Sequence, residues 1–188
     1  MTDMTTTPNL ASLTALPLSH FGTPDQPLHT ISLLVRNQPG VLVRVALVFS
    51  RRGYNIESLV VSPGIDDTLY SRMTITCRGE QNTLEQIIKQ LFKLIDVVQA
   101  VDHTGQAVVE TEIALVKIKA SLSERTEVLQ IAEHYKGMVK DYQADSLIIQ
   151  VSGQTDKLDN FIDLLRPFGV VELVRSGKLL MARGTDAT

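Results

Sequence analysis

The residues from Asn37 to Gly40 combine the groups that bind a small charged ligand. They spell Asn-Gln-Pro-Gly and separate a strand-like run, TISLLV, from an apolar run typical of a helix. A helix start offers free N–H groups and a partial positive charge, which attract anions. Glycine has no Cβ, so a ligand can approach the backbone closely, and the amide of Asn37 offers both a donor and an acceptor. This combination suits a ligand that carries an ammonium and a carboxylate group.

The same four residues also suit a plain turn, because proline and glycine are frequent at helix starts. Asn55 is a second amide, at the start of the next strand, and we expect it near the same end of the sheet as Asn37. Its alternative role is an Asx turn after Gly53. Sequence spacing alone leaves both interpretations open at each position.

Residues for catalysis or metal binding are not recognisable elsewhere in the sequence. It contains no phosphate loop, no dinucleotide-binding glycine motif and no nucleophile elbow. Asp66 and Asp67 fit a solvated hairpin. The four histidines lie in different predicted elements without the i, i+4 spacing of a helical metal site: His20, His29, His103 and His134. We therefore expect no catalytic and no metal-binding residue.

The elements around Asn37 follow from hydrophobic periodicity. Strands are predicted over residues 30–35, 55–61, 70–77 and 97–101. A first helix is predicted over residues 40–52, with Pro39 in its first turn and Gly53 as its C-cap. A second helix should start at a capping box of Asn82 and Glu85. Its apolar stripe would comprise Leu84, Ile87, Ile88, Leu91 and Ile95.

The second half of the chain repeats this order. Strands are predicted over residues 113–120, 138–142, 147–151 and 170–175, with an extra one over 179–182. One helix should be capped by Ser123 and end at Gly137, and another should carry an apolar stripe over residues 158–165. The fold class is therefore α+β, with two ferredoxin-like βαββαβ modules, each an antiparallel sheet with two helices on one face. We assign residues 1–27 to a flexible tail, 28–104 to the first module and 105–188 to the second.

Composition limits the classes of partner. A net charge of −3, mixed charge signs and 5% aromatic residues disfavour a nucleic-acid-binding surface. Cys77 is the only cysteine, so an intrachain disulfide is impossible. No apolar run approaches the ~20 residues of a membrane helix, and the N-terminus lacks the pattern of a secretory signal. We expect a cytoplasmic protein without nucleic-acid or membrane partners.

The first helix predicts a protein partner. From Val41 to Phe49 only Arg44 is polar, whereas a helix on one face of a small sheet should show a polar stripe to water. A βαββαβ sheet also leaves its second face bare. We therefore expect at least a homodimer. The alternative is that the helix is buried between the two modules of its own chain.

Five segments together resemble the regulatory, or small, subunit of acetohydroxyacid synthase, also called acetolactate synthase. The resemblance covers residues 28–184 and is carried by RNQPGVLVRVALVFSRRGYNIESL, LYSRMTI, LEQIIKQLFKLIDV, EIALVKI and VELVRSG. It implies that the first module is an ACT domain, which binds amino acids at a dimer interface. It also implies an ACT-like regulatory second module.

The resemblance further implies a subunit that is not itself catalytic. Such a subunit activates the large subunit and confers feedback inhibition by valine in branched-chain amino acid biosynthesis. Thiamine diphosphate, Mg and FAD would belong to the large subunit, and this chain would hold no cofactor. By similarity, the valine site would comprise Asn37, Gly40, Val41, Leu42, Asn55 and Ile56.

Three other functions fit the same topology. A small enzyme of the acylphosphatase type would use Arg44 at the first turn, but the turn is poor in glycine. An RNA-binding module would need aromatic residues on the third strand, which carries Ser71, Arg72, Thr74 and Thr76 instead. A free-standing amino-acid sensor without an enzyme partner is the nearest alternative.

Overall fold

The computed structural model describes residues 26–64, 68–185 and 188. Most of the predicted N-terminal tail, and the predicted turn at Asp66 and Asp67, lie outside these residues. In the described part of the chain, no helix is long and apolar enough to cross a membrane. The elements of the first module are β1 (Leu28–Arg36), α1 (Val41–Ser50), β2 (Ile56–Pro63), β3 (Tyr70–Arg78), α2 (Gln81–Leu91) and β4 (Val97–Asp102).

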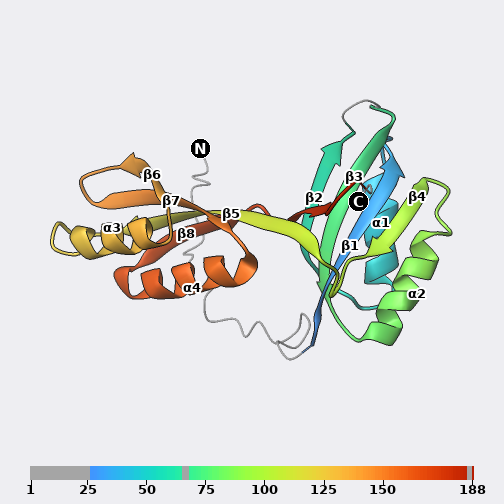
Figure 1. The fold of residues 1–188 in the computed structure, drawn as a ribbon, viewed down its shortest axis with the longest axis horizontal. Helices are drawn as coiled ribbons and strands as arrows, with labels where there is room; N and C mark the ends of the chain where they lie inside the picture. Colours follow the sequence, from blue (N-terminus) through green and yellow to red (C-terminus); the bar gives the residue numbers. More distant parts are fainter. Residues whose placement is uncertain (1–25, 65–67, 186–187) are drawn as a thin grey trace, which may run out of the picture.

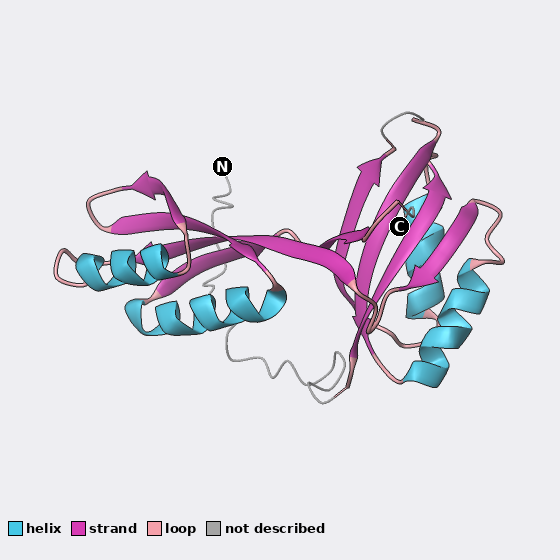
Figure 2. Cartoon of the chain, viewed as in Figure 1, coloured by secondary structure: helices cyan, strands magenta, loops and turns pink. Residues whose placement is uncertain are grey.

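The second module begins with a long strand. Its elements are β5 (Val108–Lys119), α3 (Arg125–His134), β6 (Met138–Tyr142), β7 (Ser146–Gly153), α4 (Thr155–Leu165), η2 (Arg166–Phe168), β8 (Val170–Arg175) and β9 (Leu179–Ala182). The sheets have the strand orders β2-β3-β1-β4 and β6-β7-β5-β8, and every pairing is antiparallel. Both helices of each module lie on one face of its sheet (Figure 2). The predicted fold class of two βαββαβ modules is confirmed.

Alternation along the strands decides which face the helices cover. In β1, Ile31, Leu33 and Val35 are buried in one core with Val45 and Phe49 of α1. The second core has the same construction, with Ala114, Val116 and Ile118 of β5 packed among residues of α3 and α4. Each module therefore has its own hydrophobic core.

One long strand connects the two modules. The second half of β5 is central in its own sheet, whereas Val108–Thr111 pair with β9 to form a two-stranded ribbon. Figure 1 shows β5 running from one module to the other. Leu180 of β9 is buried, and the ribbon shares a groove with Leu34 and Val60 on the helix-free face of the first sheet. The chain itself thus covers part of the face that was expected to be bare.

Several helix ends in the structure differ from the predicted ones. Helix α1 starts at Val41 and ends at Ser50, so Gly40 is the N-cap and Pro39 lies outside the helix. Helix α2 starts at Gln81 after an N-cap at Glu80, without a side-chain cap bond, so the capping box of Asn82 and Glu85 is wrong. The helix ends at Leu91, and Ile95 is consequently 84% exposed instead of part of the stripe.

The cap of α3 also differs from the prediction. Ser121, not Ser123, pairs with Glu124 at the start of this helix. At the other end, Lys136 has the positive φ of 58°, and Gly137 does not. Gly137 is needed for space, because a Cβ there would lie 3.1 Å from Cγ2 of Ile149.

Candidate ligand-binding site

Two hydrogen bonds connect Asn37 to the loop before β3. Its backbone N–H donates to the carbonyl of Leu69 at 2.6 Å, and its side-chain Nδ2 donates to the carbonyl of Thr68 at 3.0 Å. These bonds hold the amide in one orientation at the exposed end of β1. Among the described residues, no donor binds the Oδ1 atom of Asn37. The side chain therefore presents an acceptor that suits an ammonium group.

The start of α1 offers donors beside this acceptor. Gly40 is the N-cap with φ of 83°, a left-handed conformation that side chains disfavour. Among the described residues, no side chain caps the helix, and its first turn has no acidic residue. Val41 is buried in the core and anchors the turn, whereas Leu42 is 43% exposed next to it. The free N–H groups and the helix dipole make this point attractive to a carboxylate.

Arg44 and Asp96 form an ion pair beside the same turn. Nε and Nη2 of Arg44 both donate to Oδ2 of Asp96, at 2.9 and 2.7 Å. The Asp96 side chain is 8% exposed, and its backbone carbonyl accepts a bond from the N–H of Arg36 at the end of β1. Sequence reasoning missed Asp96, which is 52 residues away from its partner. Arg44 carried a signal, as the only polar residue between Val41 and Phe49.

Asn55 and Ile56 lie at the opposite end of the sheet. Arg36 pairs with Tyr70 at the start of β3, whereas Ile56 pairs with Cys77 near its end. Seven residues of strand separate these positions, or about 23 Å. The expectation that Asn55 lies near the same end as Asn37 is therefore wrong. Helix α1 crosses the whole sheet before β2 starts, so one copy of the chain does not bring the six predicted residues together.

The equivalent turn of the second module is filled by its own side chains. Oε2 of Glu124 accepts bonds from the N–H of Ser121 at 2.9 Å and from its hydroxyl at 2.5 Å, which lower the pKa of Glu124. Arg125 is buried, donates to the carbonyls of Gln143 and Ala144, and stacks on the ring of Tyr142. This turn already holds a carboxylate, so it offers no comparable site.

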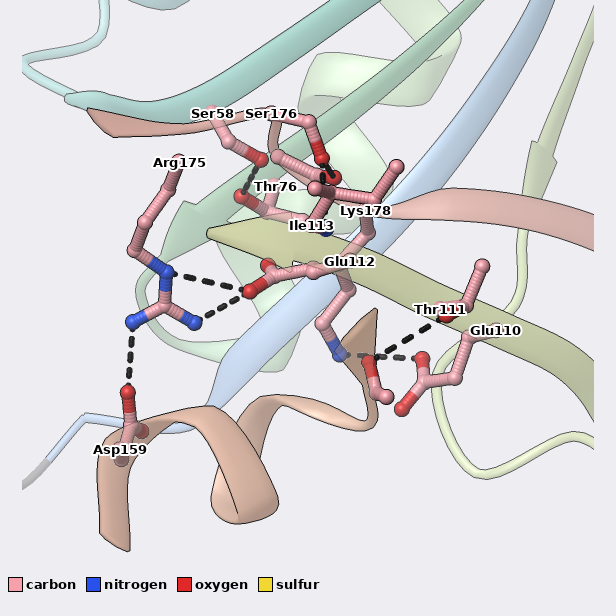
Figure 3. Close-up of polar contacts among 12 residues, drawn as sticks. Ser58, Thr76, Glu110, Thr111, Glu112, Ile113, Asp159, Arg175, Ser176 and Lys178 are labelled. Atoms are coloured by element: carbon pink, nitrogen blue, oxygen red, sulfur yellow. Dashed lines mark hydrogen bonds and ion pairs between the residues drawn. The ribbon is translucent and has the colours of Figure 1, made fainter. Parts of the chain in front are cut away.

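A second polar cluster lies between the modules (Figure 3). Arg175 binds Glu112 and Asp159, and Lys178 binds Glu110 at 3.0 Å. Burial alone would lower the pKa of Arg175, but its bonds to the two carboxylates raise it. Residues of both modules surround an adjoining cavity of about 330 Å³. Because these charges pair with one another, the cluster acts as a structural junction.

Metal binding requires several ligands in one place. Within residues 26–64 and 68–185, no three His, Cys, Asp or Glu side chains gather in that way. The chemistry available at the Asn37–Gly40 turn is hydrogen bonding and charge complementarity.

Comparison with known proteins shows the family to which this chain belongs. Residues 31–99 match the family described as "AHAS small subunit-like ACT domain", and residues 111–184 match "Small subunit of acetolactate synthase". The chain belongs to the family of acetolactate synthase small subunits. Residues 31–99 accordingly form an ACT domain, as the resemblance implied.

Relatives and a solved structure agree with this assignment. The chain is 46% identical over 162 residues to the "Probable acetolactate synthase small subunit" of Methanothermobacter thermautotrophicus, covering 84% of this chain and 94% of that protein. It is 42% identical over 158 residues to the acetolactate synthase small subunit of Mycobacterium leprae, covering 84% and 93%. The crystal structure of the small subunit from Thermotoga maritima matches with a TM-score of 0.76 at 35% identity, over 85% of this chain and 99% of that one.

Proposed function

We propose that this chain is a non-catalytic regulatory subunit that activates the large, catalytic subunit of acetolactate synthase and makes it sensitive to valine. The enzyme would form acetolactate in the biosynthesis of valine, leucine and isoleucine, in the cytoplasm. Thiamine diphosphate, Mg and FAD would be held by the large subunit and not by this chain. The observation that carries the proposal is the start of α1, which no described side chain caps, beside the oriented amide of Asn37 in a member of this family.

Valine fits the chemistry of the Asn37–Gly40 turn. Its carboxylate would accept from the N–H groups at the start of α1, where Gly40 leaves room for close approach. Its ammonium group would donate to Oδ1 of Asn37. Its isopropyl group would contact the exposed side chain of Leu42. Buried Val41 would hold the turn in place from below.

A homodimer would complete this site with Asn55 and Ile56. Strand β2 is at the edge of its sheet, and an edge strand can pair with a second copy. If a two-fold axis pairs two β2 strands antiparallel, each β2 start comes to the end of the sheet where the other copy has its Asn37–Gly40 turn. Exposed apolar residues of α1 also favour a covering partner: Leu42, Val43 and Leu47 are 43, 62 and 44% exposed.

Reconstitution tests the proposed function. The purified chain should not turn over pyruvate, because it should lack a thiamine diphosphate site. Added to the matching large subunit, it should raise the rate of acetolactate formation, and valine should then lower that rate. Pyruvate turnover by the purified chain alone would contradict the proposal. Valine binding without any effect on the large subunit would favour the free-standing amino-acid sensor instead.

A further inference from the structure

One nitrogen of Arg44 points toward the start of its own helix. A Cβ built on Gly40 would lie 3.2 Å from Nη1 of Arg44, so this atom is close above the N-cap. Nε and Nη2 of the same guanidinium are both engaged by Asp96. Among the described residues, Nη1 has no hydrogen-bond partner. The arrangement leaves one edge of the guanidinium facing the candidate site.

The position of Arg44 is fixed in advance by Asp96. The Asp96 carboxylate is nearly buried, at 8% exposure, whereas the Arg44 side chain is 45% exposed. The carbonyl of Asp96 accepts a 2.8 Å bond from the N–H of Arg36, which ties it to the end of β1. A guanidinium is planar, so bonds along one edge orient the other edge as well. The free edge therefore needs little further ordering when a ligand arrives.

The charge at this point favours a carboxylate more than the helix start alone would. The partial positive charge at the start of α1 and the full charge of Arg44 both lie beside Gly40. Hydrogen bonds between a guanidinium and a carboxylate are stronger than those between neutral groups. Asp96 neutralises part of the charge of Arg44, but its carboxylate binds the edge of the guanidinium formed by Nε and Nη2 and leaves Nη1 free of it.

We propose that Arg44 contacts the carboxylate of the bound amino acid and that Asp96 is its positioning residue. The site therefore binds amino acids with a free carboxylate more tightly than amino alcohols of the same shape. This inference rests on the proposed function, because it assumes an amino-acid ligand at the Asn37–Gly40 turn. It assigns to the Arg44–Asp96 pair a role beyond tying α1 to the segment before β4.

Calorimetry of the full-length chain with two probes tests this role. L-valine and L-valinol share the ammonium and isopropyl groups, but valinol lacks the carboxylate. The Arg44→Gln variant should bind valine about 10- to 100-fold more weakly, the range expected when a charged hydrogen bond is lost. Its affinity for valinol should be unchanged. Arg44→Lys should recover part of the loss, because lysine keeps the charge without the planar fork.

Two further variants separate positioning from folding. Asp96→Asn should reduce the preference for valine over valinol less than Arg44→Gln does, because Arg44 stays charged but loses its orientation. Arg52→Gln is the matched control, because Arg52 follows the other end of α1 and its side chain donates only to the exposed Gln86 among the described residues. It should leave both affinities unchanged. Thermal unfolding of each variant reports any general loss of stability.

The outcomes distinguish this inference from the proposed function. If Arg44→Gln weakened valine and valinol equally, Arg44 would be a structural residue only, and the inference would be wrong while valine binding stood. If Arg44→Gln bound valine as tightly as the native chain, the inference would also be wrong. If the native chain bound no valine at all, the proposed function would fail, and this inference with it.

Discussion

Replacing Gly40 with aspartate should abolish valine sensitivity while the protein stays folded. Gly40 has φ of 83°, and a left-handed conformation costs an ordinary residue about 1–2 kcal/mol, with aspartate among the better tolerated. Domains typically have about 5–15 kcal/mol of stability. The new Cβ would lie 3.2 Å from Nη1 of Arg44, so the guanidinium would need to move by only a few tenths of an ångström. The substitution is therefore tolerable for folding.

The effect on binding should be much larger. The introduced carboxylate would lie beside Arg44 and the start of α1, where the carboxylate of valine would otherwise bind. Two like charges about 4 Å apart repel by roughly 4 kcal/mol at an effective dielectric constant near 20. That corresponds to about a thousandfold loss of affinity. Competition for the same donors adds to this loss, so we expect no inhibition at valine concentrations that saturate the native enzyme.

A valine titration of the reconstituted enzyme measures this effect. Gly105→Asp is the matched control, because Gly105 has a similar φ of 73° and no described atom lies within 4 Å of its Cβ position. It makes the same change of charge and backbone strain in the turn after β4. The control should remain valine-sensitive, and both variants should still activate the large subunit. If Gly40→Asp were as valine-sensitive as the control, the Asn37–Gly40 turn would be only a connection.

Three further predictions concern the dimer, the core of the first module and the junction between the modules. Light scattering should find at least a dimer at micromolar concentration. Leu47→Glu should weaken the dimer, because Leu47 is an exposed apolar residue of α1. A native monomer would contradict a site shared between copies. Burial raises the pKa of Cys77 to about 12, so iodoacetamide should label only the unfolded chain at pH 8.5. The free energy of unfolding should fall as pH rises above 9.0, because the thiol then ionises in the unfolded chain but not in the folded one. Glu112→Gln should lower the free energy of unfolding by about 1–3 kcal/mol in urea, because Arg175 loses its buried partner; an unchanged midpoint would show that the pair contributes nothing.

The sequence was sufficient for the fold because strands and cores obey local periodicity. Apolar residues alternate along β1 and recur every three to four positions along α1, and both patterns point to one core. Helix ends were less predictable, because several neighbouring residues can cap a helix equally well. Asn82 has the right side chain for a cap, but α2 starts one residue before it.

The candidate site was only half predictable. The Asn37–Gly40 turn is contiguous in sequence, so its donor and acceptor groups are visible without a structure. The role of Asp96 could not be predicted from the sequence, because its ion pair with Arg44 depends on how α2 returns the chain to β4. The predicted location of Asn55 was wrong because of the strand topology. Strands β1 and β2 are both antiparallel to β3, so the end of one and the start of the other lie at opposite ends of the sheet.

That separation yields a sharp test of a site shared between copies. In a two-fold dimer, each site would take Asn37 from one copy and Asn55 from the other. Homodimers of Asn37→Ala or Asn55→Ala should have both sites weakened by about 0.5–3 kcal/mol each. In a mixed dimer both substitutions fall in one site, and the other keeps both native amides. Differently tagged chains, purified as the mixed dimer, should therefore bind valine at one site with native affinity in calorimetry. A mixed dimer with two weakened sites would mean that each copy carries a complete site, contrary to the pairing of two β2 strands.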